Sequence, residues 1–131
     1  MELAVVIIVV VLVLIGFALY LKKSWKRNRL KGAARAKAVE SMQRVRKIPD
    51  LHRRILEADS VLERALGDLG YGGSMADKLR RAGKYLPGLQ DIWTAHKLRN
   101  RIAHEPGIML TEKETERSVA AFERAVLRLC S

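Results

Sequence analysis

The hydrophobic and polar positions divide the chain into one continuous apolar run followed by a series of amphipathic segments. Residues 3–21 are LAVVIIVVVLVLIGFALYL, nineteen residues without a charge. As a helix rising about 1.5 Å per residue, such a run is about 28 Å long, close to the thickness of a bilayer's hydrocarbon core. Because lipid supplies no water to satisfy the backbone, we predict a transmembrane helix over residues 1–21.

Beyond Pro49, apolar residues recur every three or four positions, which is typical of helices with one buried face. No segment alternates with period two over the length of a strand. We therefore expect an all-α fold, in which a small antiparallel helical bundle of four or so helices over residues 49–131 follows the transmembrane helix. The expected helices run from Asp50 to about Leu69, from Ser74 towards Pro87, from about Leu89 to Glu105, and onward from Thr111.

Polar residues at the expected helix starts support these boundaries. Asp50 can accept a hydrogen bond from the first turn of its helix. Ser74 with Asp77, and Thr111 with Glu114, have the spacing of capping boxes. The glycines of LGYGGS, at 69–74, favour a plain turn, and an anion-binding cradle at the following helix start is the alternative.

The positive charge is concentrated in one short segment. The chain has a formal net charge of +11, and residues 22–47 hold eleven Lys or Arg against the single acid Glu40. Residues 48–131 hold fourteen basic and twelve acidic side chains. The sequence therefore predicts a basic juxtamembrane helix or linker over residues 22–48.

The flanks of the apolar run predict its orientation. Only Glu2 is charged before it, whereas KKSWKRNRLKGAARAK follows it. The positive-inside rule then places the N-terminus outside and the remainder in the cytoplasm, as in a single-pass protein of the cell (inner) membrane. Tyr20 and Trp25 occupy positions expected for an interfacial aromatic belt. A cleaved signal peptide is the alternative, disfavoured by a start without Lys or Arg, by the length of the apolar run and by the absence of a small-residue cleavage site.

The basic segment allows two further interpretations. It can rest as a solvated helix on anionic lipid headgroups, or it can be a nucleic-acid-binding arm. The scarcity of interleaved aromatic side chains favours the membrane surface.

The predicted domain has a thin core and would gain stability from self-association. About 84 residues follow the basic segment, and their aromatic bulk is limited. Two chains anchored in one membrane meet at a raised effective concentration, so we expect a homodimer. The single cysteine, Cys130, cannot form an intrachain disulfide and fits a reducing compartment.

The segment HKLRNRIAHE, residues 96–105, concentrates polar side chains near the end of the third expected helix. At 100° per residue, Asp91, Ala95, Leu98 and Ile102 form the expected core stripe. A second stripe consists of Trp93, Lys97, Asn100 and His104. We expect Trp93 to contact the core. We expect His52 and His96 to lie at the surface.

Arg99, Asn100 and His104 form the candidate catalytic group at this helix end. An imidazole can transfer a proton, a guanidinium can stabilise a negatively charged phosphorane, and an amide can orient either group. These groups suffice for metal-free RNA cleavage by the 2′-hydroxyl. The three histidines lack the spacing of metal ligands, and no cofactor motif is present, so neither a metal nor a cofactor is expected.

The arrangement resembles the HEPN superfamily, small all-α domains whose motif is Arg, four to six residues, then His, commonly with a polar residue after the Arg. Arg99, Asn100 and His104 fit it with a four-residue gap, and the resemblance covers residues from about Asp50 to Leu129. It implies a bundle of four or five helices and frequent dimers. Many members are metal-independent ribonucleases of toxin or defence systems, while others bind nucleotides or proteins. Some members add an acidic partner, for which Glu57, Asp59 and Glu63 are candidates here.

A second pair tests how specific the motif is. Arg46 and His52 also fit the motif, with a five-residue gap, but Pro49 between them breaks the helix that they would need. Each candidate residue also has a structural alternative: His104 as a helix C-terminal charge, Arg99 in an ion pair, and Asn100 in an interhelix hydrogen bond.

The sequence therefore supports three functions. The first is a metal-independent RNA endonuclease that uses Arg99, Asn100 and His104. The second is a non-catalytic, membrane-tethered interaction module that binds a protein or nucleotide through the same residues. In the third, the basic segment itself binds the membrane surface.

Overall fold

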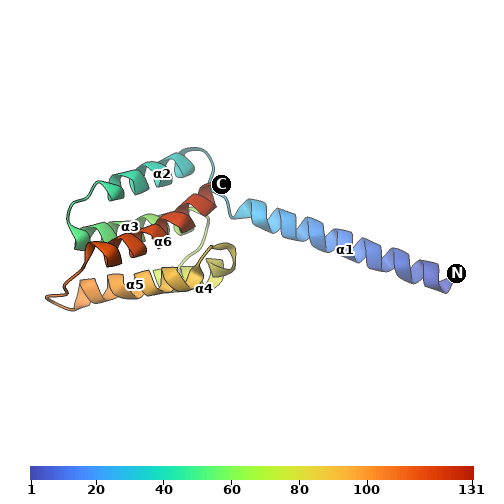
Figure 1. The fold of residues 1–131 in the computed structure, drawn as a ribbon. Coiled ribbons are helices and arrows are strands. Elements are labelled where there is room, and N and C mark those ends of the chain that lie inside the picture. Colours follow the sequence, from blue (N-terminus) through green and yellow to red (C-terminus); the bar gives the residue numbers. More distant parts are fainter.

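The chain is described by a computed structural model that covers the backbone of residues 1–131 and all side chains except those of residues 24–27. The prediction of an all-α fold is confirmed, because the described residues form helices and no strand (Figure 1). The helices are α1 (Glu2–Arg27), α2 (Gly32–Arg46), α3 (Leu51–Asp68), α4 (Met75–Ala82), a 3₁₀ turn η1 (Gly83–Tyr85), α5 (Leu89–His104) and α6 (Glu112–Cys130).

Helix α1 projects away from the remaining helices (Figure 1). Residues Glu2–Lys23 are long and apolar enough to cross a membrane, and no part of this span is buried within the protein. At about 1.5 Å per residue, these 22 residues extend about 33 Å. Tyr20 is exposed near the end of the span, whereas the side chain of Trp25 lies outside the described residues.

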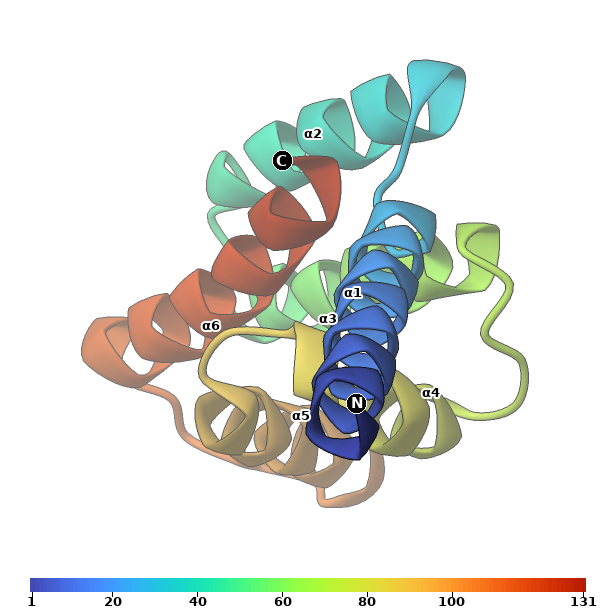
Figure 2. The same cartoon turned by 90° about the vertical axis from the view of Figure 1, so that its right-hand side faces the viewer.

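The other helices form a bundle around a central pair, α3 and α6, with α2 on one side and α4 and α5 on the other (Figures 1 and 2). The core is continuous across these helices, and its largest fully buried apolar side chains are Phe122, Met42, Ile55, Leu62, Leu66, Leu79, Ile92 and Leu129. The bundle is not simply antiparallel. Helices α3 and α6 run in the same direction, whereas α2 and α5 run in the opposite direction (Figure 1).

The predicted helix starts agree with the structure. The Asp50 side chain accepts from the backbone N–H of Arg53 at 2.7 Å. The hydroxyls of Ser74 and Thr111 accept from backbone N–H groups in the capping boxes that open α4 and α6. Since these bonds satisfy otherwise unpaired N–H groups, each stabilises its helix start by about 1 kcal/mol.

Helix α2 corrects the expectation of a solvated basic helix. Ala38, Ser41, Met42 and Val45 are buried against the bundle, at spacings of three and four residues. The guanidinium of Arg46 bridges the carboxylates of two α6 residues, Glu116 and Glu123. Half of the basic segment is therefore an integral helix of the bundle.

Residues just after α1 are also bonded to the bundle. Tyr71 donates its hydroxyl hydrogen bond to Asn28, and the backbone N–H of Leu30 donates to the carbonyl of Leu129 at 2.7 Å. Arg35 Nε donates to the carbonyl of Cys130, also at 2.7 Å. The connection between the apolar helix and the bundle is thus short, and it is bonded to the segment after α3 and to the C-terminal end of α6.

Candidate functional site

Helix α5 supplies the three candidate residues, and its ends have simple local causes. It begins after Gly88, whose φ of +60° is a left-handed conformation that glycine adopts without steric cost. It ends at His104, one residue before the expected boundary, where Glu105 turns to an extended conformation. Ile92, Ala95 and His96 are its fully buried residues. Of the expected stripe, Ala95 is buried and Leu98 and Ile102 are partly buried against the core, whereas Asp91 is exposed.

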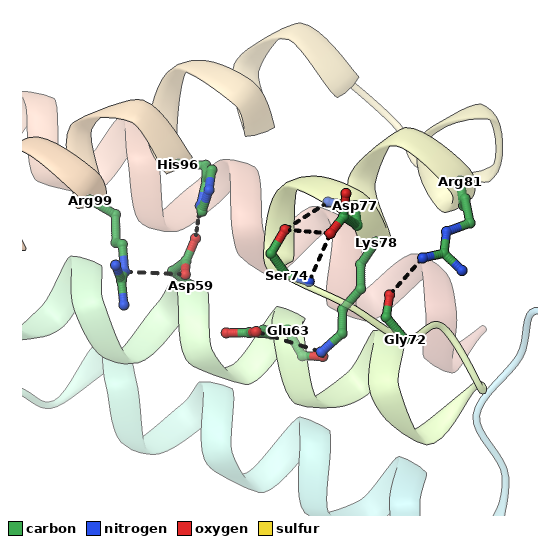
Figure 3. Close-up of polar contacts among 9 residues, drawn as sticks. All are labelled: Asp59, Glu63, Gly72, Ser74, Asp77, Lys78, Arg81, His96 and Arg99. Carbon is green, nitrogen blue, oxygen red and sulfur yellow. Dashed lines mark hydrogen bonds and ion pairs between the residues drawn. The ribbon is translucent and has the colours of Figure 1, made fainter.

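A buried hydrogen bond between Asp59 and His96 joins α5 to α3. Asp59, on α3, is 1% exposed, and its Oδ1 lies 2.7 Å from Nδ1 of His96 (Figure 3). His96 is 7% exposed, so the expectation that it lies at the surface is wrong. Trp93, which is partly buried against the core, meets the His96 ring edge-on at a centroid distance of 6.2 Å. The imidazole is therefore enclosed by protein on several sides.

Arg99 and Asn100 extend this pair into a closed ring of polar contacts, which we call the Asp59 cluster (Asp59, His96, Arg99 and Asn100). Arg99 Nε lies 3.4 Å from Asp59 Oδ2 (Figure 3). Arg99 Nη1 donates to Asn100 Oδ1 at 3.3 Å. Asn100 Nδ2 lies 3.3 Å from His96 Nε2. Each member thus contacts two others.

The contacts define one consistent arrangement of hydrogens. Nδ1–H of His96 donates to the Asp59 carboxylate, and Nε2 then accepts from the Asn100 amide, whose oxygen accepts from Arg99. This assignment rests on the bonding pattern. The contact between Arg99 and Asp59 is the weakest of the four. The buried Nε of Arg99 forms an ion pair with Asp59 but no aligned hydrogen bond among the described residues.

His104 lies outside the Asp59 cluster. It is the exposed last residue of α5, four positions after Asn100 and therefore on the same side of the helix. Among the described residues it forms no hydrogen bond or ion pair with Arg99 or Asn100. The structure thus brings Arg99 and Asn100 into contact and leaves the His104 imidazole open to solvent one turn away.

Of the three candidate acids, Asp59 contacts Arg99 of the motif. The sequence could have indicated this residue, since Asp59 lies among Ile55, Ala58 and Leu62 on the buried face of α3. His96 similarly follows Ile92 and Ala95 on the buried face of α5. A charged residue on a buried face usually has a partner, so the two faces together indicate the pair.

The alternative sites of the sequence have structural roles. The capping-box carboxylate of Asp77 already occupies the start of α4, where an anion cradle was the alternative, and hydrogen bonds from Ser74 lower the pKa of Asp77. His52 Nε2 contacts the carbonyl of Ile108 at 2.6 Å, and Arg46 pairs with α6, so this second Arg–His pair does not form one site. The described residues contain no group of three potential metal ligands.

Comparisons of the chain with protein-family models, with curated proteins and with solved structures found no match.

Proposed function

We propose that this protein is a single-pass, membrane-anchored HEPN-like protein whose cytoplasmic domain is a metal-independent RNA endonuclease, active as a homodimer. The observation that supports it best is the pairing of Arg99 with buried Asp59, beside Asn100 and one turn from exposed His104. Arg99 keeps 31% of its side chain exposed, so its outer nitrogens remain accessible to a phosphate.

The chemistry requires one base and one acid. The base removes the proton of a 2′-hydroxyl, whose oxygen then bonds to the adjacent phosphorus. The acid protonates the departing 5′-oxygen as its bond to phosphorus breaks, leaving a 2′,3′-cyclic phosphate and a 5′-hydroxyl. The Arg99 guanidinium would stabilise the additional negative charge on the phosphoryl oxygens.

The need for two proton-transfer groups supports the dimer. His96 is buried, and His52 contacts a backbone carbonyl, so His104 is the open imidazole among the described residues of one chain. A second chain would supply a second His104. The anchor raises the encounter rate of two such chains in one membrane.

The orientation of the anchor follows from charge. The basic residues after the span favour the cytoplasmic side, and the N-terminus would lie outside. RNA would then be available to the domain, and anionic headgroups would attract the basic residues nearest the bilayer.

A non-catalytic interaction module is the second candidate, and the closed ring of contacts favours it. Asn100 is bonded on both sides within one chain, and the charge of Arg99 is partly neutralised by Asp59. In this case the exposed parts of Arg99 and His104 would bind a partner protein or nucleotide without turnover.

RNA cleavage by the full chain in neutral-lipid nanodiscs, in the presence of a chelator, distinguishes the two candidates. We expect His104→Ala to lower the cleavage rate by about 100-fold or more, the usual contribution of a general acid or base. Arg101→Ala is the matched control, because Arg101 is exposed on the same helix turn and pairs only with Glu105 among the described residues. Equal background cleavage by all three chains would exclude the nuclease, and loss of partner capture alone would favour the module.

A further inference from the structure

The contact between α2 and α3 differs from the other helix contacts in that no ion pair among the described side chains crosses it. Ion pairs cross from α2 to α6, α3 to α6, α3 to α4, α3 to α5 and α5 to α6. Among the described side chains, none crosses from α2 to α3, although these two helices pack closely. The cations along this contact are therefore not neutralised by the opposite helix.

A groove follows this contact. Its main hollow has a volume of about 320 Å³ and is followed by a much smaller hollow along the same two helices. Lys37 and Arg44 line it from α2, and Arg53 and Arg64 line it from α3. The two acids along the groove are Glu57 and Asp68, so cations outnumber acids by four to two.

Three of these cations are available to a ligand. Arg44 pairs with Glu40 at 2.9 Å and donates to the Ser41 hydroxyl at 3.2 Å. The side chains of Lys37, Arg53 and Arg64 form no ion pair with any described residue. The bundle thus concentrates unpaired positive charge in a concave surface, where it attracts anions more strongly than on a convex one.

The dimensions and floor of the groove indicate the class of ligand. Arg53 and Arg64 are eleven positions apart on α3, about 16 Å along the axis, which exceeds the reach of a single phosphate group. Small or aliphatic side chains, among them Ala38, Val61 and Ala65, line part of it, and the described residues that line the groove include no aromatic ring on which bases could stack. An extended polyanion held by its backbone fits this surface.

We propose that the α2–α3 groove binds the phosphodiester backbone of RNA independently of base sequence and guides it to the end of α5. Its outer end, at Arg53, adjoins His52, whose ring contacts the carbonyl of Ile108 in the segment just after His104. This inference rests on the proposed ribonuclease function, for which it names the substrate-binding surface.

Salt dependence gives a quantitative test. For a single strand, the logarithm of affinity changes with the logarithm of salt concentration by about −0.7 per neutralised phosphate. Three contacts, from Lys37, Arg53 and Arg64, predict a slope of about −2.1, or about an 18-fold loss of affinity between about 50 and 200 mM salt. Removal of two of these cations predicts a slope of about −0.7 and a loss of about threefold.

The experiment measures binding of the full chain in neutral-lipid nanodiscs to a 2′-O-methyl oligouridylate, which lacks the attacking hydroxyl. The groove variant is Lys37→Gln with Arg64→Gln. The control, Lys84→Gln with Lys113→Gln, removes the same charge from exposed residues of η1 and α6. We expect the smaller slope for the groove variant and the wild-type slope for the control.

Equal slopes for the two double variants, or no binding by the wild type at about 50 mM salt, would overturn the inference. Binding of polyglutamate in place of RNA would assign the groove to an acidic protein and also overturn it. The cleavage assay separates the two proposals. Groove-dependent binding with cleavage independent of His104 refutes the nuclease alone, whereas His104-dependent cleavage with equal slopes refutes the groove alone.

Discussion

Asp59→Ala should destabilise the bundle strongly, because it removes the carboxylate that the buried imidazole of His96 and the partly buried guanidinium of Arg99 share. Asp59 is 1% exposed and contacts both His96 and Arg99. Loss of one member of a buried pair costs about 3–5 kcal/mol, since the remaining group stays buried without its partner. A domain of this size has a total stability of about 5–15 kcal/mol, so much of it would be lost. At about 4–8 °C per kcal/mol, the melting temperature should fall by more than about 10 °C.

Thermal and urea denaturation of the full chain in detergent, followed by circular dichroism, measures this effect. Asp68→Ala on the same helix is the control, because Asp68 is exposed and should change stability by less than about 0.5 kcal/mol. His96→Ala and the double variant complete a cycle, whose coupling energy should exceed about 1 kcal/mol. If Asp59→Ala melts with the control, or if the two substitutions are additive, the Asp59 cluster does not hold α3 to α5.

Three further outcomes test the fold and the anchor. Gly88→Ala should cost about 1 kcal/mol in denaturation experiments because its φ is +60°, whereas Gly72→Ala, with open space and no positive φ, should not destabilise. The backbone N–H and hydroxyl of Thr111 lower the pKa of Glu114 from its ordinary 4.5. The ionised Glu114 carboxylate therefore stabilises the folded domain above pH 4.5, and this stabilisation is lost as the pH falls through the lower folded-state pKa. Melting curves of Glu114→Gln and wild type should converge in acid. A reporter fused after Ser131 should be active only in the cytoplasm, and activity outside would refute the predicted orientation.

The helix boundaries were predictable because they depend on local chemistry. Asp50, Ser74 and Thr111 cap helices in the structure as the sequence predicts, since a cap satisfies N–H groups within three residues. The packing of α2 was less apparent. Its buried side chains, Ala38, Ser41, Met42 and Val45, form a short stripe within a segment rich in Lys and Arg, so the basic charge masks it.

The candidate site was only partly predictable. Arg99 and Asn100 were identified from adjacent positions in one motif, and the structure shows them in contact. The pairing of Asp59 with His96 spans 37 positions and depends on how α3 and α5 are aligned, which no local pattern specifies. The prediction that His96 lies at the surface was wrong for the same reason, because the packing of α3 against α5 decides which face of α5 is buried.

The bonds from Asn28 and Leu30 to Tyr71 and Leu129 limit where the protein can act. In the membrane-anchored protein that we propose, these bonds would hold the bundle close to the end of the span. The 16 residues of α5 extend about 24 Å, so its candidate residues would stay near the bilayer surface. A ligand would then have to arrive at the membrane, and two copies would meet by lateral diffusion. Their encounter would be reduced from a search in three dimensions to one in two.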